Sequence, residues 1–129
     1  MQLEQRVETF GQGNQSWLQG PHGTDCNRGV TLDTSTFTPN THYPAGYFPS
    51  GLPLGRITAT GKVGPYDNAA SDGREVLRGF LMDDVHAPAV NTLDPVGAMF
   101  IHGGVVLANL PIAVDAAGQA DVAGRIWFE

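Results

Sequence analysis

The sequence predicts a mainly β, barrel-like single domain of small size. No segment repeats apolar residues at positions i, i+3, i+4 and i+7 over a useful length, so little helix is expected. Short segments rich in β-branched residues instead alternate with Gly and Pro turns, a pattern typical of compact β folds. The length of 129 residues suits one domain, with little room for a second.

Residues 1–29 form a polar stretch rich in Gln, Gly and Asn. Phe10, Trp17 and Leu18 stand in it as isolated apolar residues. Three interpretations stay open: a disordered tail, an arm that becomes ordered on a partner with Trp17 as its anchor, and an arm that packs on its own core. The partner interpretation draws on the enrichment of Trp at binding hot spots.

The segment Val30-Thr-Leu-Asp-Thr34 alternates apolar and polar residues and predicts a short strand. Such a strand could pair at an edge of its own sheet or of another chain's sheet. We therefore expect an extended N-terminal arm over residues 1–40. Five apolar residues are predicted to contact the partner: Phe10, Trp17, Leu18, Val30 and Leu32.

Four aromatic residues follow within a short distance: Phe37, Tyr43, Tyr47 and Phe48. Aromatic residues set among prolines without a period more often cover a core or line a subunit contact than bind a ligand. The prolines and glycines that begin the segment 41–60 exclude a helix there. The same segment then becomes a plausible strand over residues 54–60.

Further strands are predicted in the C-terminal part of the chain. Residues 75–82 have strand character, and Gly79 inside them indicates a bulge or a close backbone approach. Residues 98–107 are the most apolar run of the chain. They predict a buried strand, or two strands kinked at Gly103-Gly104.

The C-terminus adds two smaller elements. Residues 115–121 could form one helical turn or a loop. Residues 125–128 predict a terminal strand, and Trp127 is expected near the apolar run or at a subunit contact. Most Leu, Ile, Val and Phe residues lie after residue 50, so the core is expected to be small, which favours oligomerisation or attachment to a larger body.

Charge and composition exclude several classes of function. The net charge is −6 and the chain has a single lysine, so the sequence shows no basic face for nucleic acid or for an anionic membrane surface. No apolar run is long enough for a membrane-spanning helix, and the N-terminus has no secretory signal pattern. Cys26 is the only cysteine, which excludes an internal disulfide.

Two clusters of titratable residues are the candidates for chemistry. The first could serve acid–base work or hold a divalent metal, although a solvated strand end explains it more simply: Asp83, Asp84 and His86. The second combines soft and hard ligands but lacks the four ligands of a structural zinc site: His22, Asp25 and Cys26. His102 is interpreted as a core or interface histidine. We expect no catalytic constellation, no cofactor and no metal.

A resemblance to a known family rests on an ordered series of residues. Residues 42–58 read HYPAGYFPSGLPLGRIT and are followed by Gly64-Pro-Tyr-Asp67, Asp72-Gly73 and Gly79-Phe-Leu81. This series resembles the lambda-type head decoration proteins in the form found in phages of actinobacteria, over roughly residues 30–129. Its Pro/Gly punctuation is specific in combination and weak piece by piece.

The resemblance implies a β-clip fold and a homotrimer that binds the major capsid protein. The trimer would be made in the bacterial cytoplasm and would sit on the outer surface of the phage head at three-fold and quasi-three-fold positions. There it would stabilise the head against packaged DNA, with no enzymatic activity. On this interpretation residues 1–40 are a flexible arm and residues 41–129 a β-rich decoration domain. The expected trimer contacts are Tyr43, Tyr47, Phe48 and Trp127.

Two alternatives belong to other classes. A β module of a virion tail or spike would have a similar composition. A small trimeric enzyme of the dUTPase type would use a related fold, but fold alone does not imply that function. The chain ends at Trp127-Phe-Glu129 without the Gly-rich tail such an enzyme needs. The N-terminal region is also long for a decoration protein.

Overall fold

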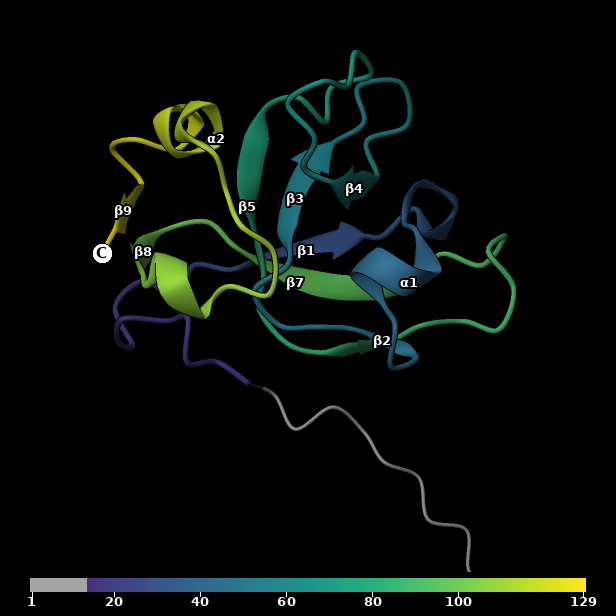
Figure 1. The fold of residues 1–129 in the computed structure, drawn as a ribbon, viewed down its shortest axis with the longest axis horizontal. Helices are drawn as coiled ribbons and strands as arrows, with labels where there is room; N and C mark the ends of the chain where they lie inside the picture. Colours follow the sequence, from purple (N-terminus) through teal and green to yellow (C-terminus); the bar gives the residue numbers. More distant parts are fainter. Residues whose placement is uncertain (1–13) are drawn as a thin grey trace, which may run out of the picture.

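A five-stranded sheet is the largest element of the computed structural model, which describes residues 14–129 (Figure 1). All neighbouring strands in it are antiparallel. Their spatial order is β1 (Arg28–Thr31), β7 (Val96–Phe100), β5 (Leu77–Leu81), β3 (Pro53–Arg56) and β4 (Val63–Pro65). The expectation of a small, mainly β domain is confirmed.

Shorter elements flank this sheet. Two strand pairs stand apart from it: β2 (Tyr47–Phe48) pairs antiparallel with β6 (Val85–His86), and β8 (Gly103–Val105) pairs parallel with β9 (Ile126–Phe128). The helices of the described chain are one or two turns long. They are α1 (Pro39–His42), α2 (Ala116–Asp121) and the 3-10 turns η1 (Thr34–Thr36) and η2 (Leu107–Asn109).

The two ends of the sheet meet just beyond β1. Leu32 forms a bridge with Val63 of β4, and the Asp33 N–H donates to the Val63 carbonyl at 2.8 Å. The sheet therefore curls until its first and last strands touch at one point. Along Arg28–Thr31 itself, β1 pairs with β7 on one side. On its other side it has no paired strand within residues 14–129.

Asp94 holds this contact between the two ends. One carboxylate oxygen accepts from the Thr34 N–H at 3.1 Å, and the other pairs with the Lys62 ammonium at 2.7 Å. The buried Thr34 hydroxyl donates to the Leu93 carbonyl at 2.6 Å. The hydrogen bond from Lys62 lowers the pKa of the Asp94 carboxyl below its ordinary value. Asp94 thus joins the chain that follows β1 to the loop before β4.

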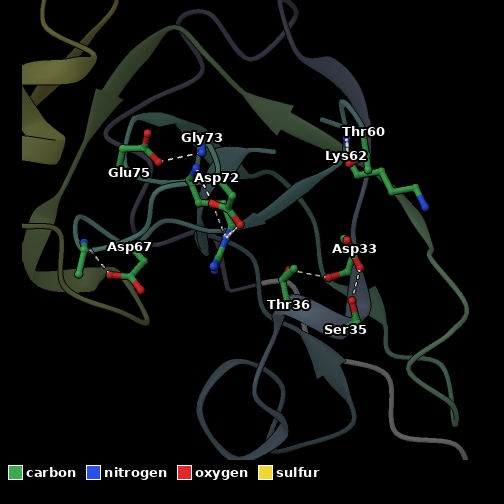
Figure 2. Close-up of polar contacts among 11 residues, drawn as sticks. Asp33, Ser35, Thr36, Thr60, Lys62, Asp67, Asp72, Gly73 and Glu75 are labelled. Atoms are coloured by element: carbon green, nitrogen blue, oxygen red, sulfur yellow. Dashed lines mark hydrogen bonds and ion pairs between the residues drawn. The ribbon is translucent and has the colours of Figure 1, made fainter. Parts of the chain in front are cut away.

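Short-range hydrogen bonds fix the turns beside the sheet (Figure 2). The Ser35 hydroxyl donates to the Asp33 carboxylate at 2.6 Å. In the loop before β5, the Arg74 Nε donates to the Asp72 carboxylate at 2.9 Å. Asp is common in such turns because its side chain can bond the nearby chain. Arg74 is consequently already paired with a carboxylate two residues away.

Buried apolar side chains form two clusters. The Trp17 cluster contains Trp17, Leu77, Phe80, Met82, Phe100, Val105, Val114, Val122 and Ile126. The Leu54 cluster contains Leu32, Phe37, Phe48, Leu52, Leu54, Val63, Leu81, Ala87 and Met99. Phe80 and Leu81 of β5 enter different clusters, and so do Met99 and Phe100 of β7, as the alternation of side chains along a strand requires.

The expected arm boundary at residue 40 is wrong for the part of the chain that is described. The Trp17 and Leu32 side chains are both 0% exposed, and β1 pairs with β7 over its whole length. Residues 14–40 therefore belong to the same folded unit as residues 41–129. Composition could not show this, because each isolated apolar residue finds its neighbours far away in the sequence.

Several predicted elements need smaller corrections. One helical turn, α1, begins at Pro39 and reaches into the segment from which a helix was excluded. Proline is compatible with a first helical position, because its missing N–H would be unpaired there anyway. The strand predicted over residues 54–60 ends at Arg56, and the chain turns back at Gly61, which has a φ of 75°. Residues 116–121 are helical, the first of the two alternatives.

The apolar run 98–107 divides into β7 and β8, so the two-strand alternative is confirmed. The chain changes direction at Gly103, where φ is 134° and a Cβ would lie 2.4 Å from the His22 carbonyl oxygen. The close approach expected at Gly79 is also present, since a Cβ there would meet the Phe100 carbonyl oxygen at 2.3 Å. Val105 is fully buried, whereas Val106 is only half-buried.

We predict that Val105→Asp unfolds the domain or lowers its stability by more than about 3 kcal/mol, because it places a carboxylate in the Trp17 cluster without a partner. Thermal melting followed by circular dichroism measures this. The matched control is Val90→Asp, since Val90 is 53% exposed. Equal melting temperatures for the two variants would contradict the core assignment.

We also predict that Asp94→Asn lowers the melting temperature at neutral pH. A carboxyl with a lowered folded-state pKa stabilises the fold above its unfolded pKa of about 4, and that stabilisation is lost as pH falls through the folded-state pKa. The difference between wild type and variant should therefore shrink below pH of about 4. Melting curves across this range test the sign, and a difference that grows in acid would refute it.

Candidate interaction surface

The residues predicted to contact a partner are mostly inside the fold. Phe10 lies outside the described residues. Trp17 and Leu32 are core residues, so neither is an accessible anchor. Leu18 and Val30 are half-buried and pack against the Trp17 and Leu54 clusters respectively. The large apolar side chains of residues 14–40 therefore pack in the domain's own core or against it.

The residues predicted for a trimer contact divide in the same way. Phe48 is 0% exposed and is a core residue, which corrects that prediction. The Tyr43 ring covers it with centroids 4.8 Å apart, and Tyr47 is half-buried opposite His86. Trp127 differs from these, because 44% of it is exposed. It is the predicted contact residue that the fold leaves most open.

Strand β9 brings Trp127 to the surface beside residues from the beginning of the described chain. The Trp127 Nε1–H donates to the Gln19 side-chain oxygen at 2.6 Å. The His22 ring lies 5.6 Å from the indole in a tilted arrangement, and the His102 ring stands edge-on at 6.1 Å. We call Gln19, His22, His102 and Trp127 the Trp127 surface.

Glycines of β8 make this gathering possible. A Cβ on Gly104 would lie 2.6 Å from the Trp127 Nε1, and closer still to the Gln19 side chain. Gly104 also accepts the backbone hydrogen bond of Gln19 N–H at 3.1 Å. The chain segment that carries Gln19 can therefore lie directly against β8. The parallel pairing of β8 with β9 places Trp127 opposite Gly104.

The two histidines contact each other. Their Nε2 atoms are 3.2 Å apart, so one imidazole must donate and the other must accept in this geometry. Beside them lies a cavity of about 690 Å³, whose lining includes His22, Asp25 and Trp127. An aromatic face with polar ends suits recognition of a protein partner, where Trp supplies contact area at low entropic cost.

Residues of the titratable clusters noted in the sequence take part in hydrogen bonds with nearby segments. Asp83 accepts from the Gln15 amide at 2.9 Å, and Asp84 accepts from the Ser50 N–H at 2.6 Å. His86 is exposed at the end of β6. In the second cluster, the Asp25 carboxylate raises the pKa of the Cys26 thiol, which disfavours the nucleophilic thiolate.

Neither a metal-binding cluster nor a membrane-spanning helix occurs among the described residues. Within residues 14–129 no three His, Cys, Asp or Glu side chains gather as a set that could hold a metal ion. His22 turns to His102 and not to Cys26. In the same range, no helix has the length and apolar character needed to cross a membrane.

Sequence reasoning identified Trp127 but missed its neighbours. Gln19 and His22 lie more than a hundred residues before Trp127, in a stretch without a period. His102 was recognised as a core or interface residue without a partner. No local signal pairs it with His22, because the contact joins residues 80 positions apart.

No protein-family model matches the chain, and a comparison with curated proteins finds no match either.

We predict that the two tryptophans differ in accessibility to a collisional quencher. Trp127→Phe leaves only the buried Trp17, whose fluorescence acrylamide should quench weakly. The wild-type protein keeps Trp127 as well, and acrylamide should quench its fluorescence more strongly than that of Trp127→Phe. Equal quenching of the two proteins would contradict the exposure of Trp127.

Proposed function

We propose that this chain is a structural virion protein, a trimeric decoration protein of the lambda type that binds the outside of a phage head. The observation that carries the proposal is the ordered residue series of residues 42–81. In the fold, this series runs from α1 through β2 and β3 to β5, with Phe48, Leu52 and Leu54 in the core. A small, mainly β domain is consistent with the β-clip fold that the resemblance implies.

The proposed mechanism is preferential binding to the assembled capsid. A protein that binds assembled capsid subunits, but not dissociated ones, stabilises the assembly by mass action. A trimer that caps a three-fold position would hold several subunits of the major capsid protein together. Once one contact forms, the other two bind at high effective concentration, which adds avidity. Such a role requires binding surfaces and no catalytic group.

The candidate contacts change with the fold. Trp17 and Leu32 no longer qualify, because they hold the domain together. Trp127 and its neighbours are the best described candidate for a contact with the capsid or with a second subunit. The segment 1–13, with Phe10, stays part of the proposal as a capsid-binding arm. Tyr43 and Tyr47 remain as secondary candidates for the trimer contact.

We predict that Trp127→Ala weakens attachment to heads or abolishes trimer formation, while the melting temperature of the monomeric domain changes little. A hot-spot Trp should lose on the order of 2 kcal/mol per contact. Co-sedimentation with expanded, undecorated heads under limiting protein measures attachment. Analytical ultracentrifugation of free protein separates the trimer contact from the capsid contact.

Two further proteins complete this experiment. Val90→Ala is the matched control, because it removes another exposed apolar side chain. A chain without residues 1–13 tests the arm, since residues 14–129 contain the whole described core. If wild type, Trp127→Ala and the shortened chain all decorate heads equally, the proposed contacts are wrong. If wild type itself does not bind heads, the decoration function is wrong.

A further inference from the structure

Four arginines from distant parts of the sequence meet around one cavity. Its volume is about 720 Å³. Arg28 comes from β1, Arg56 from β3, Arg78 from β5 and Arg125 from the residue before β9. The chain has only seven Lys and Arg residues and a net charge of −6. More than half of its cations thus gather at one place, although the sequence shows no basic run.

Three of these arginines have no ion pair within the described part of the chain. Arg28, Arg56 and Arg78 are exposed and form no side-chain hydrogen bond there. Lys62 and Arg74, by contrast, are each paired with a carboxylate. The cavity lining contains no Asp or Glu. The described residues that line the cavity therefore supply no carboxylate to neutralise its positive charge.

Arg125 is held differently and shapes the cavity. Its guanidinium donates to the Ile101 carbonyl at 2.9 Å and to the Arg78 carbonyl at 3.3 Å. These bonds tie the chain before β9 to β5 and to the end of β7. Arg125 is thereby a positioning residue, and the other three guanidiniums, which have no partner within residues 14–129, are the groups that could meet a ligand.

The remaining lining is apolar or belongs to a strand edge. Val96, which is 73% exposed, and the half-buried Val30 and Ile101 contribute aliphatic surface, whereas Val63 and Met99 in the lining are buried. All four residues of β1 line the cavity, and β1 has no ladder partner on the side away from β7 within residues 14–129. A free strand edge can pair with an extended chain through backbone hydrogen bonds.

We propose that this arginine cavity is a docking site for an extended acidic segment of a partner protein. Carboxylates of the segment would pair with Arg28, Arg56 and Arg78, since guanidinium matches carboxylate with two parallel hydrogen bonds. Its alternate apolar side chains would meet the aliphatic lining. The backbone of the bound segment would lie beside the free edge of β1.

Other anions use fewer of these features. A nucleic acid would meet the arginines, but it would have no use for a strand edge or an aliphatic lining, and the net charge of −6 repels it. A small phosphate or carboxylate would fill a minor part of about 720 Å³. A polypeptide uses charge, apolar surface and strand edge together. The arginine cavity shares no lining residue with the Trp127 surface, and binding of an acidic segment there does not depend on head decoration.

The test uses the full chain and a fluorescein-labelled peptide of alternating Glu and Val with blocked ends. Fluorescence anisotropy should show saturable binding that weakens as salt rises. The matched peptide of alternating Gln and Val should bind at least about tenfold more weakly, because a neutral amide loses the charge-assisted bonds. Equal binding of the two peptides, or no saturable binding of either, would overturn the proposal.

Variants locate the binding. Arg28→Gln, Arg56→Gln and Arg78→Gln should each weaken binding about fivefold, and the triple variant on the order of a hundredfold if the effects add. Arg74→Gln removes a cation that does not line the cavity and whose carboxylate partner, Asp72, lies in the same loop, so it should leave the affinity within about twofold. The triple Arg→Lys variant keeps the positive charges but loses the planar guanidinium that donates two parallel hydrogen bonds. Its affinity should therefore lie between those of the wild type and the triple Arg→Gln variant.

Three outcomes would assign the cavity to another occupant and overturn the proposal. The first is a single-stranded oligonucleotide that binds more tightly than the acidic peptide in the same assay. The second is inorganic phosphate at millimolar concentration displacing the peptide completely at constant ionic strength. The third is self-association that the triple Arg→Gln variant abolishes, measured by ultracentrifugation without peptide, which would identify a second copy of this chain as the occupant.

Discussion

The Trp17 indole lies where three distant segments of the chain meet. Its ring contacts Phe100 edge-on at 5.3 Å and Phe80 at 5.8 Å, and its Nε1–H donates to the Ser50 hydroxyl at 3.0 Å. Ser50 in turn donates to the Met82 carbonyl at 2.6 Å. The polar end of the indole is thereby satisfied inside an apolar cluster, which removes the cost of burying it.

The backbone around Trp17 uses the same anchor. The Val106 N–H donates to the Trp17 carbonyl at 2.7 Å, and Leu18 bridges to Val105. This brings the segment 14–20 against β8, and β8 in turn pairs with β9. Gln19 and Trp127 consequently become neighbours. The surface residues at this end of the molecule depend on a core contact that they do not themselves make.

The curled sheet produces the second surface. Its first and last strands touch through Leu32 and Val63, and Asp94 holds the adjoining segments. Contact at one point leaves β1 open along Arg28–Thr31 and turns the arginines of β1, β3 and β5 toward one cavity. One surface is aromatic and the other cationic. Two partners, or two parts of one partner, with different chemistry would fit them.

Local signals in the sequence determined much of the fold. Gly and Pro set the turns, β-branched and apolar segments set strands near β1, β3, β5, β7, β8 and β9, and Gly79 marked a close backbone approach. The exposed Trp127 was also within reach of sequence reasoning. These features depend on residues a few positions apart, and a sequence shows such relations directly.

The tertiary structure decided what depends on distant contacts. Trp and Phe are residue types that are common at interfaces. Only the packing of strands far along the chain places Trp17 and Phe48 in the core. The pairing of His22 with His102 and the gathering of four arginines join residues that no local pattern connects. The physical reason is that burial and charge density are properties of the folded surface, to which each residue adds from its own strand.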